Sequence, residues 1–117
     1  MDDDPAVRSM VREILELHTS YEVVAEAENG CDAVLQAAKV NPDLIVLDLS
    51  MPTMNGLDAA PLLKKVVPDA RVILFTVHDG AEIQRNALAA GIEAVVSKER
   101  FSELIPQAQR LLSTANA

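Results

Sequence analysis

The sequence predicts an α/β fold, in which helices cover both faces of a doubly wound parallel sheet. Apolar residues alternate along the chain between the spacing of helices and short, nearly continuous runs, which are typical of buried parallel strands. Aromatic residues make up only 3% of the chain, so Val, Ile, Leu and Ala must fill the core. The length of 117 residues suits one domain, which we expect over residues 1–117 with a frayed tail at 113–117.

The first expected element is a helix over residues 5–18. Asp4 is a suitable N-cap, and Pro5 suits the first helical position, where no N–H is needed. An apolar stripe at spacings of three and four residues follows, formed by Val7, Met10, Val11, Ile14 and Leu17. We therefore expect this helix to pack one face on the core.

The remaining elements alternate between strand and helix. Four short runs rich in aliphatic and β-branched residues predict strands at 21–27, 44–49, 70–77 and 93–97. Helical spacing between and after them predicts helices at 31–40, about 57–66, about 80–90 and about 102–114. Breakers separate these elements, and Pro106 falls near the start of the last helix, where a missing N–H costs least.

The predicted order of elements lacks an opening strand. A doubly wound unit normally opens with a strand, whereas this chain opens with a helix, and the acids at 2–4 lie where that strand would end. The first strand is therefore missing or truncated. The natural start lies upstream, or the strands at 21–27 and 44–49 pair directly, or a second copy fills the gap in a homodimer.

The charge balance excludes some classes of partner. Eighteen acids against ten bases give a formal net charge of −8, and such a surface repels nucleic acids and anionic membranes. No run approaches the roughly 18 apolar residues of a membrane span, and the acidic start is unlike a signal peptide. Cys31 is the only cysteine, which fits a reducing compartment. We expect a cytoplasmic protein that binds neither nucleic acid directly nor membranes.

Polar residues gather where the predicted strands end. Asp2 and Asp3 stand at the end of the absent strand, Asp48 near the end of the strand at 44–49. Thr76 lies near the end of the strand at 70–77, and Lys98 follows the strand at 93–97. Because ligands bind at the carboxyl ends of strands in open α/β sheets, we expect three carboxylates, a hydroxyl and an ammonium to converge there.

This combination of groups indicates phosphoryl transfer. Clustered carboxylates need a cation, and an all-oxygen set suits Mg²⁺ or a similar hard divalent ion. A carboxylate can itself act as the nucleophile and form an aspartyl phosphate. The step needs in-line positioning and charge neutralisation, which a cation and an ammonium can supply.

Four motifs in order carry a resemblance to a known family. The stretches "DDDP", "LIVLDLSMPTMNGLD", "VILFTVHD" and "AGIEAVVSKER" resemble those of the receiver domain of two-component response regulators, along essentially the whole chain. The resemblance implies a flavodoxin-like fold similar to that of chemotaxis regulators, with strand order 2-1-3-4-5, in which the missing first strand is central.

The resemblance implies roles for the residues at the strand ends. Asp48 is the implied phosphoacceptor, and Asp2 and Asp3 would hold Mg²⁺ together with it. Ser50 would add its backbone carbonyl to the metal.

The resemblance also implies how the phosphoryl group is received and sensed. Lys98 would pair with the acceptor carboxylate and then with the phosphoryl group, and Thr76 would move to hydrogen-bond that group. The donor would be a sensor histidine kinase, and the signal would pass to a downstream output domain or protein. Val95 stands where the family usually has an aromatic residue, and Glu99 is typical of relatives with DNA-binding outputs.

One other function remains open from the sequence, and a third is disfavoured. A pseudo-receiver would keep the fold and bind partners without phosphorylation, because the truncated start misplaces Asp2 and Asp3. A phosphatase of the haloacid dehalogenase type would need an acid two residues after the nucleophile, where this chain has Ser50. We therefore expect a phosphoacceptor that is not an enzyme, apart from self-catalysed phosphotransfer and autodephosphorylation.

Overall fold

The computed structural model describes residues 1–78 and 80–115. Its helices are α1 (Pro5–His18), α2 (Gly30–Val40), α3 (Gly56–Val66), α4 (Ala81–Ala89) and α5 (Leu104–Ala115). A short 3-10 helix, η1 (Lys98–Glu103), leads into α5. The strands are β1 (Leu44–Leu47), β2 (Arg71–Thr76) and β3 (Ala94–Ser97). The alternation of helices and strands confirms the predicted α/β class.

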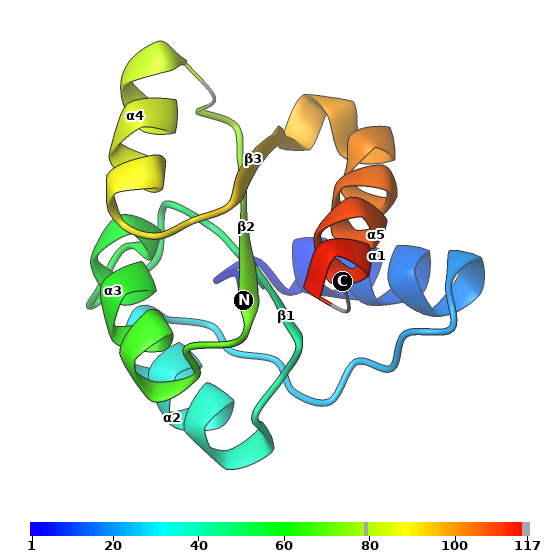
Figure 1. Ribbon diagram of the computed structural model, residues 1–117, viewed down its shortest axis with the longest axis horizontal. Coiled ribbons are helices and arrows are strands. Elements are labelled where there is room, and N and C mark those ends of the chain that lie inside the picture. The colour runs from blue at the N-terminus through cyan, green and yellow to red at the C-terminus, as the bar shows by residue number, and fades with distance from the viewer. Residues whose placement is uncertain (79, 116–117) are drawn as a thin grey trace.

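The three strands form one parallel sheet in the order β1-β2-β3. Helices α2, α3 and α4 lie on one side of the sheet, and α1 and α5 lie on the other (Figure 1). Side chains of the central strand β2 alternate between the two layers. Val72 and Leu74 face α3, whereas Ile73 and Phe75 pack with residues of α5. The sheet is therefore covered on both faces, as its continuous apolar runs predict.

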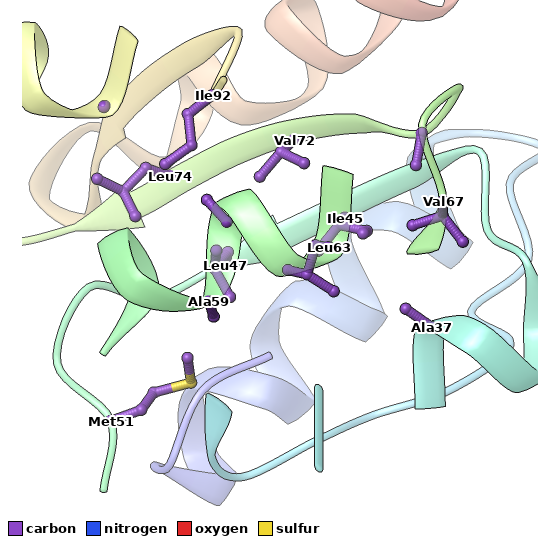
Figure 2. Close-up of a cluster of buried hydrophobic side chains, with 13 residues drawn as sticks. Ala37, Ile45, Leu47, Met51, Ala59, Leu63, Val67, Val72, Leu74 and Ile92 are labelled. Atoms are coloured by element: carbon purple, nitrogen blue, oxygen red, sulfur yellow. The ribbon is translucent and has the colours of Figure 1, made fainter. Parts of the chain in front are cut away.

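The larger apolar cluster lies between the sheet and α3. Leu63 of α3 packs here against Ile45 and Leu47 of β1, with Val72 and Leu74 above them (Figure 2). All five side chains are buried. This cluster fixes α3 beneath the strand that ends at the predicted site.

The predicted start of α1 is confirmed in detail. The side chain of Asp4 caps the helix, because its Oδ1 accepts the N–H of Ala6 at 2.9 Å, and Pro5 takes the first helical position. The helix places Leu15 in the core. Residues 2 and 3 are thereby held at the helix entry rather than left as a free leader.

The strand predicted at 21–27 is wrong for the described chain. Residues 21–27 run extended but belong to no ladder. The physical reason is the absence of a neighbour, because only Met1 and Asp2 stand between this segment and β1. The N–H of Asp2 donates to the Ala27 carbonyl at 3.0 Å, and the Met1 amine donates to the Val46 carbonyl at 2.7 Å. The two segments therefore do not close directly on each other at this end.

The carboxyl-terminal part differs from the prediction in two details. The last helix begins at Leu104 rather than near 102, because η1 intervenes after β3. α5 continues through Ala115, where the sequence predicted a tail from residue 113, and residues 116–117 of that tail lie outside the described residues.

Among the described residues, no helix has the length and apolar character needed to cross a membrane.

Candidate functional site

Three strand ends bring their polar residues to one edge of the sheet. Asp48 follows β1 directly, Thr76 is the last residue of β2, and Lys98 follows β3. The register pairs Thr76 with Ser97, so Lys98 comes one residue beyond that pair. The arrangement predicted from strand ends is thus present in the fold.

The N-terminal acids join this edge although almost no strand precedes them. Asp48 N–H donates to the Met1 carbonyl at 2.9 Å, and Arg8 donates from its guanidinium to the Asp2 carbonyl at 2.7 Å. The Oδ1 of Asp2 also accepts the N–H of Asp4 at 3.0 Å. These bonds fix Asp2 from both sides, and its side chain is buried.

The three acids lie within reach of a single ion. Asp2, Asp3 and Asp48 each offer one carboxylate oxygen, and these oxygens all lie within 4.8 Å of one another. Asp2 and Asp48 are buried, whereas Asp3 is exposed to solvent. Three carboxylates facing an open side form an oxygen donor set that fits Mg²⁺, which keeps several water ligands.

Lys98 bridges the two buried acids. Its Nζ lies 2.8 Å from Oδ2 of Asp2 and 3.2 Å from Oδ1 of Asp48. The ammonium therefore neutralises part of the charge of the buried acids. A cation that binds the same two carboxylates must compete with Lys98 for them.

Burial and neighbouring charge shift the ionisation of the site. Burial raises the pKa of Asp48, the Asp2 carboxylate raises it further, and Lys98 opposes both. Burial alone would lower the pKa of Lys98, but its hydrogen bond to Asp2 and the charge of Asp48 outweigh it, so that this pKa is raised. These shifts favour the charged form of Lys98, whereas the charge of Asp48 is costly without a counter-charge.

Thr76 and Ser50 differ in how firmly the structure places them. Thr76 is buried, and its Oγ1 accepts the N–H of His78 at 3.1 Å. A threonine hydroxyl that accepts one bond still has a proton to donate toward the site. Ser50 is exposed in the loop after Asp48, and the metal contact of its carbonyl stays a prediction.

Two glycines set the loop behind Asp48. A Cβ on Gly56 would collide with the Asp48 carbonyl oxygen, and a Cβ on Gly30 would collide with the Met54 carbonyl oxygen. The Gly56 N–H also donates to the Leu49 carbonyl at 2.8 Å. The start of α3 therefore lies directly against the backbone of the phosphoacceptor candidate.

We expect Gly56→Ala to destabilise the protein by about 1–3 kcal/mol, because the new methyl group overpacks the Asp48 backbone. Urea unfolding monitored by circular dichroism would measure this loss. Gly80→Ala is the matched control, since a Cβ at that position meets no atom within 4 Å. Equal stabilities of the two variants would show that the loop accommodates the new methyl group without a loss of stability.

Arg8 is a supporting residue that sequence reasoning missed. It donates to the Asp2 carbonyl, and its Nε lies 3.4 Å from Oε1 of Glu26. Its position one helical turn after the cap Asp4 was the available signal, since this spacing turns the side chain back toward the N-terminus. Arg8 thereby links α1 to Asp2, the acid that precedes this helix in the chain.

Comparison with protein families matches residues 1–109 to the response regulator receiver domain. The transcriptional regulatory protein DegU of Brevibacillus brevis is 32% identical over 117 residues, which are 100% of this chain and 50% of that protein. The chemotaxis protein CheY of Bacillus subtilis (strain 168) is 34% identical over 116 residues, 99% of this chain and 91% of that protein.

Solved structures give the same fold. A two-component response regulator of the LuxR family from Aurantimonas sp. SI85-9A1 superposes with a TM-score of 0.91 at 32% identity, covering 97% of this chain and 81% of that chain. The chain spans about half the length of several of the curated relatives that it matches, between 50% and 55% for the first four.

Proposed function

Because the chain belongs to the response regulator receiver domain family, we propose that it is a phosphorylation-dependent switch with Asp48 as phosphoacceptor. One observation carries this proposal. The oxygens of Asp2, Asp3 and Asp48 lie within 4.8 Å of one another, with Lys98 at hydrogen-bond distance from Asp2. Clustered acids that converge with a lysine on a strand end are the parts that aspartyl phosphorylation requires.

The proposed reaction transfers a phosphoryl group from a phosphohistidine of a sensor histidine kinase. An oxygen of the Asp48 carboxylate attacks phosphorus, the P–N bond breaks, and the imidazole leaves with the electron pair and takes up a proton. Asp2, Asp3 and Asp48 would hold Mg²⁺, with the Ser50 carbonyl as a further ligand, and the ion would supply neutralising charge at the phosphoryl oxygens.

Lys98 and Thr76 would act on the phosphorylated form. Lys98 already contacts Asp48, so a small turn of its side chain brings the ammonium to a phosphoryl oxygen. Thr76 can donate its hydroxyl proton to a phosphoryl oxygen while its own oxygen keeps the bond from His78. Both movements pull on β2 and β3, which would shift the surface near α4 and α5 between two populations.

The partners follow from the family and from the relatives. We propose a sensor histidine kinase as donor and an output domain or protein as receiver of the signal, in a cytoplasmic location. Relatives described as transcriptional regulators favour a DNA-binding output elsewhere in the full protein, while this acidic domain itself binds no nucleic acid. The protein would act as a phosphoacceptor rather than as an enzyme, and a homodimer remains part of the proposal.

A pseudo-receiver is the second candidate, and the small number of backbone bonds that hold Met1 and Asp2 favours it. Asp2 keeps its place through its own bond to Ala27 and through the bonds of Met1 to Val46 and Asp48. If thermal motion opens these bonds, Asp2 and Asp3 leave Asp48, and only a partner-binding domain remains.

Intact-mass analysis after incubation with acetyl phosphate and Mg²⁺ tests the proposal. We expect a gain of about 80 Da in the parent chain, since one phosphoryl group is added as an aspartyl phosphate. Asp48→Asn is the matched control and gains nothing. A parent chain that stays unmodified, while its circular dichroism shows an intact fold, would establish the pseudo-receiver instead.

A further inference from the structure

The peptide unit that joins Asp2 to Asp3 is held by a side chain of α1. Nη1 of Arg8 donates to the Asp2 carbonyl at 2.7 Å, and this carbonyl belongs to the planar unit between the two acids. The N–H of Asp2 donates on its other side to the Ala27 carbonyl at 3.0 Å. The orientation of that unit decides where both acidic side chains point. The bond from Arg8 therefore bears on two of the three carboxylates of the acidic cluster.

Glu26 aligns the guanidinium of Arg8 with this carbonyl. Its Oε1 lies 3.4 Å from Nε of Arg8, and its Oε2 lies 2.9 Å from Nη2 of Arg12, one turn further along α1. The side chain of Arg8 is 19% exposed, against 44% for that of Arg12. Both arginines thus contact Glu26, and Arg8 is the inner one, which bonds Asp2.

The positive charge of Arg8 by itself opposes the binding of a cation. A guanidinium stays charged in proteins, and Arg8 lines the same cavity of about 40 Å³ as Asp2 and Asp48. Coulomb repulsion from this charge lowers the affinity of the acids for any divalent ion. The partly exposed pair that Arg8 forms with Glu26 contributes little to stability. What Arg8 can add to the site is therefore geometry, through the peptide unit that it bonds.

Mg²⁺ and Ca²⁺ distinguish an effect of geometry from an effect of charge. Mg²⁺ demands near-ideal octahedral coordination, whereas Ca²⁺ accepts a flexible arrangement of oxygen ligands. Both ions carry the same charge, so a change in electrostatic potential moves their affinities together. A displaced ligand weakens the binding of Mg²⁺ more than that of Ca²⁺. The ratio of the two affinities therefore reports how well the carboxylates are positioned.

We propose that Arg8 is a positioning residue of the metal site, and that Glu26 aligns it. Arg8 orients the peptide unit between Asp2 and Asp3 so that the two acids meet the strict geometry of Mg²⁺. The inference rests on the proposed metal site of Asp2, Asp3 and Asp48, and adds to it the residues that set its selectivity between divalent ions.

Calorimetric titration of the parent chain and of Arg8→Met with each ion tests the proposal. We expect Arg8→Met to bind Mg²⁺ about tenfold more weakly, as for other residues that orient metal ligands, although it removes a positive charge. The binding of Ca²⁺ should weaken only about twofold, because its coordination tolerates displaced ligands. Arg8→Lys keeps the charge and a donor on a shorter side chain, and should recover part of the Mg²⁺ affinity.

Arg12→Met is the matched control, because it removes the same charge from the same face of α1 and also breaks a contact to Glu26. It should leave both affinities within about twofold of the parent values. Glu26→Gln keeps Arg8 but loosens its alignment. At high salt, which screens the lost charge itself, this variant should shift the selectivity in the same direction as Arg8→Met by a smaller factor. It serves as the test where circular dichroism shows that Arg8→Met does not fold.

Three results would overturn the proposal while leaving the metal site in place. They are equal losses of Mg²⁺ and Ca²⁺ affinity in Arg8→Met, a gain of Mg²⁺ affinity in that variant, and equal effects of Arg8→Met and Arg12→Met. Charge or a general loosening of α1 would then account for the data. A parent chain that binds no Mg²⁺ would overturn the proposed metal site and this inference together.

Discussion

Lys98→Met should lower the free energy of unfolding by about 3–5 kcal/mol in metal-free buffer. The ammonium lies 2.8 Å from Asp2 and 3.2 Å from Asp48, and removing it leaves two buried carboxylates without a counter-charge. Burial and, after it, repulsion from Asp2 already raise the pKa of Asp48 while Lys98 is in place. Urea unfolding in the presence of a chelator would measure the loss.

The same substitution should strengthen the binding of Mg²⁺, although the loss of a contact usually weakens a binding site. Mg²⁺ and the ammonium compete for Asp2 and Asp48, so the apparent affinity for Mg²⁺ should rise in Lys98→Met, and saturating Mg²⁺ should restore most of the lost stability. Titration calorimetry and unfolding with and without Mg²⁺ give both quantities.

Lys65→Met is the control for this prediction, because Lys65 is an exposed lysine on α3 away from the acids. It should change neither stability beyond about 0.5 kcal/mol nor the response to Mg²⁺. If Lys98→Met behaves like this control, the contacts of Lys98 contribute nothing to the site. If it loses stability but does not recover with Mg²⁺, the three acids do not form a metal site.

The parts of the fold that could be predicted depend on local signals. The cap at Asp4 and the run beginning at Leu44 specify their elements through neighbouring residues, and the structure has both where they were expected. The segment 21–27 has the composition of a strand, but a strand also needs a partner, and the partner is a property of the whole sheet. Its extended backbone was therefore predictable, and its missing ladder was not.

The candidate site likewise has one part that the sequence predicts and one part that it does not. That Asp48, Thr76 and Lys98 share an edge follows from strand ends in a parallel sheet, so the sequence sufficed to predict it. The placement of Asp2 depends on Arg8 and on the bonds around Met1, which involve residues far apart in the chain. No local pattern carries that information, so the sequence placed Asp2 and Asp3 at this edge only as the end of an absent strand, with their misplacement as the alternative.

The stability of the chain beginning at Met1 should rise by about 2.7 kcal/mol between pH 6 and pH 8. Burial lowers the pKa of the Met1 amine from 8.0 to about 6, against the opposing charge of Asp2. Between these values the unfolded chain binds the proton and the folded chain does not, so folding becomes more favourable as the pH rises. The difference between the two pKa values corresponds to about 2.7 kcal/mol. The destabilisation caused by the charged amine is fully present below pH 6 and absent above pH 8.

N-terminal acetylation isolates this contribution, because it removes the charge but keeps an N–H that can donate to the Val46 carbonyl. Both forms keep the same histidines and carboxylates, so the difference between their urea-unfolding curves across this pH range reports Met1 alone. We expect the acetylated chain to lose the rise between pH 6 and pH 8. Parallel pH profiles for the two forms would mean that the amine is hydrated in solution, and that the first residue does not hold its place between β1 and Ala27.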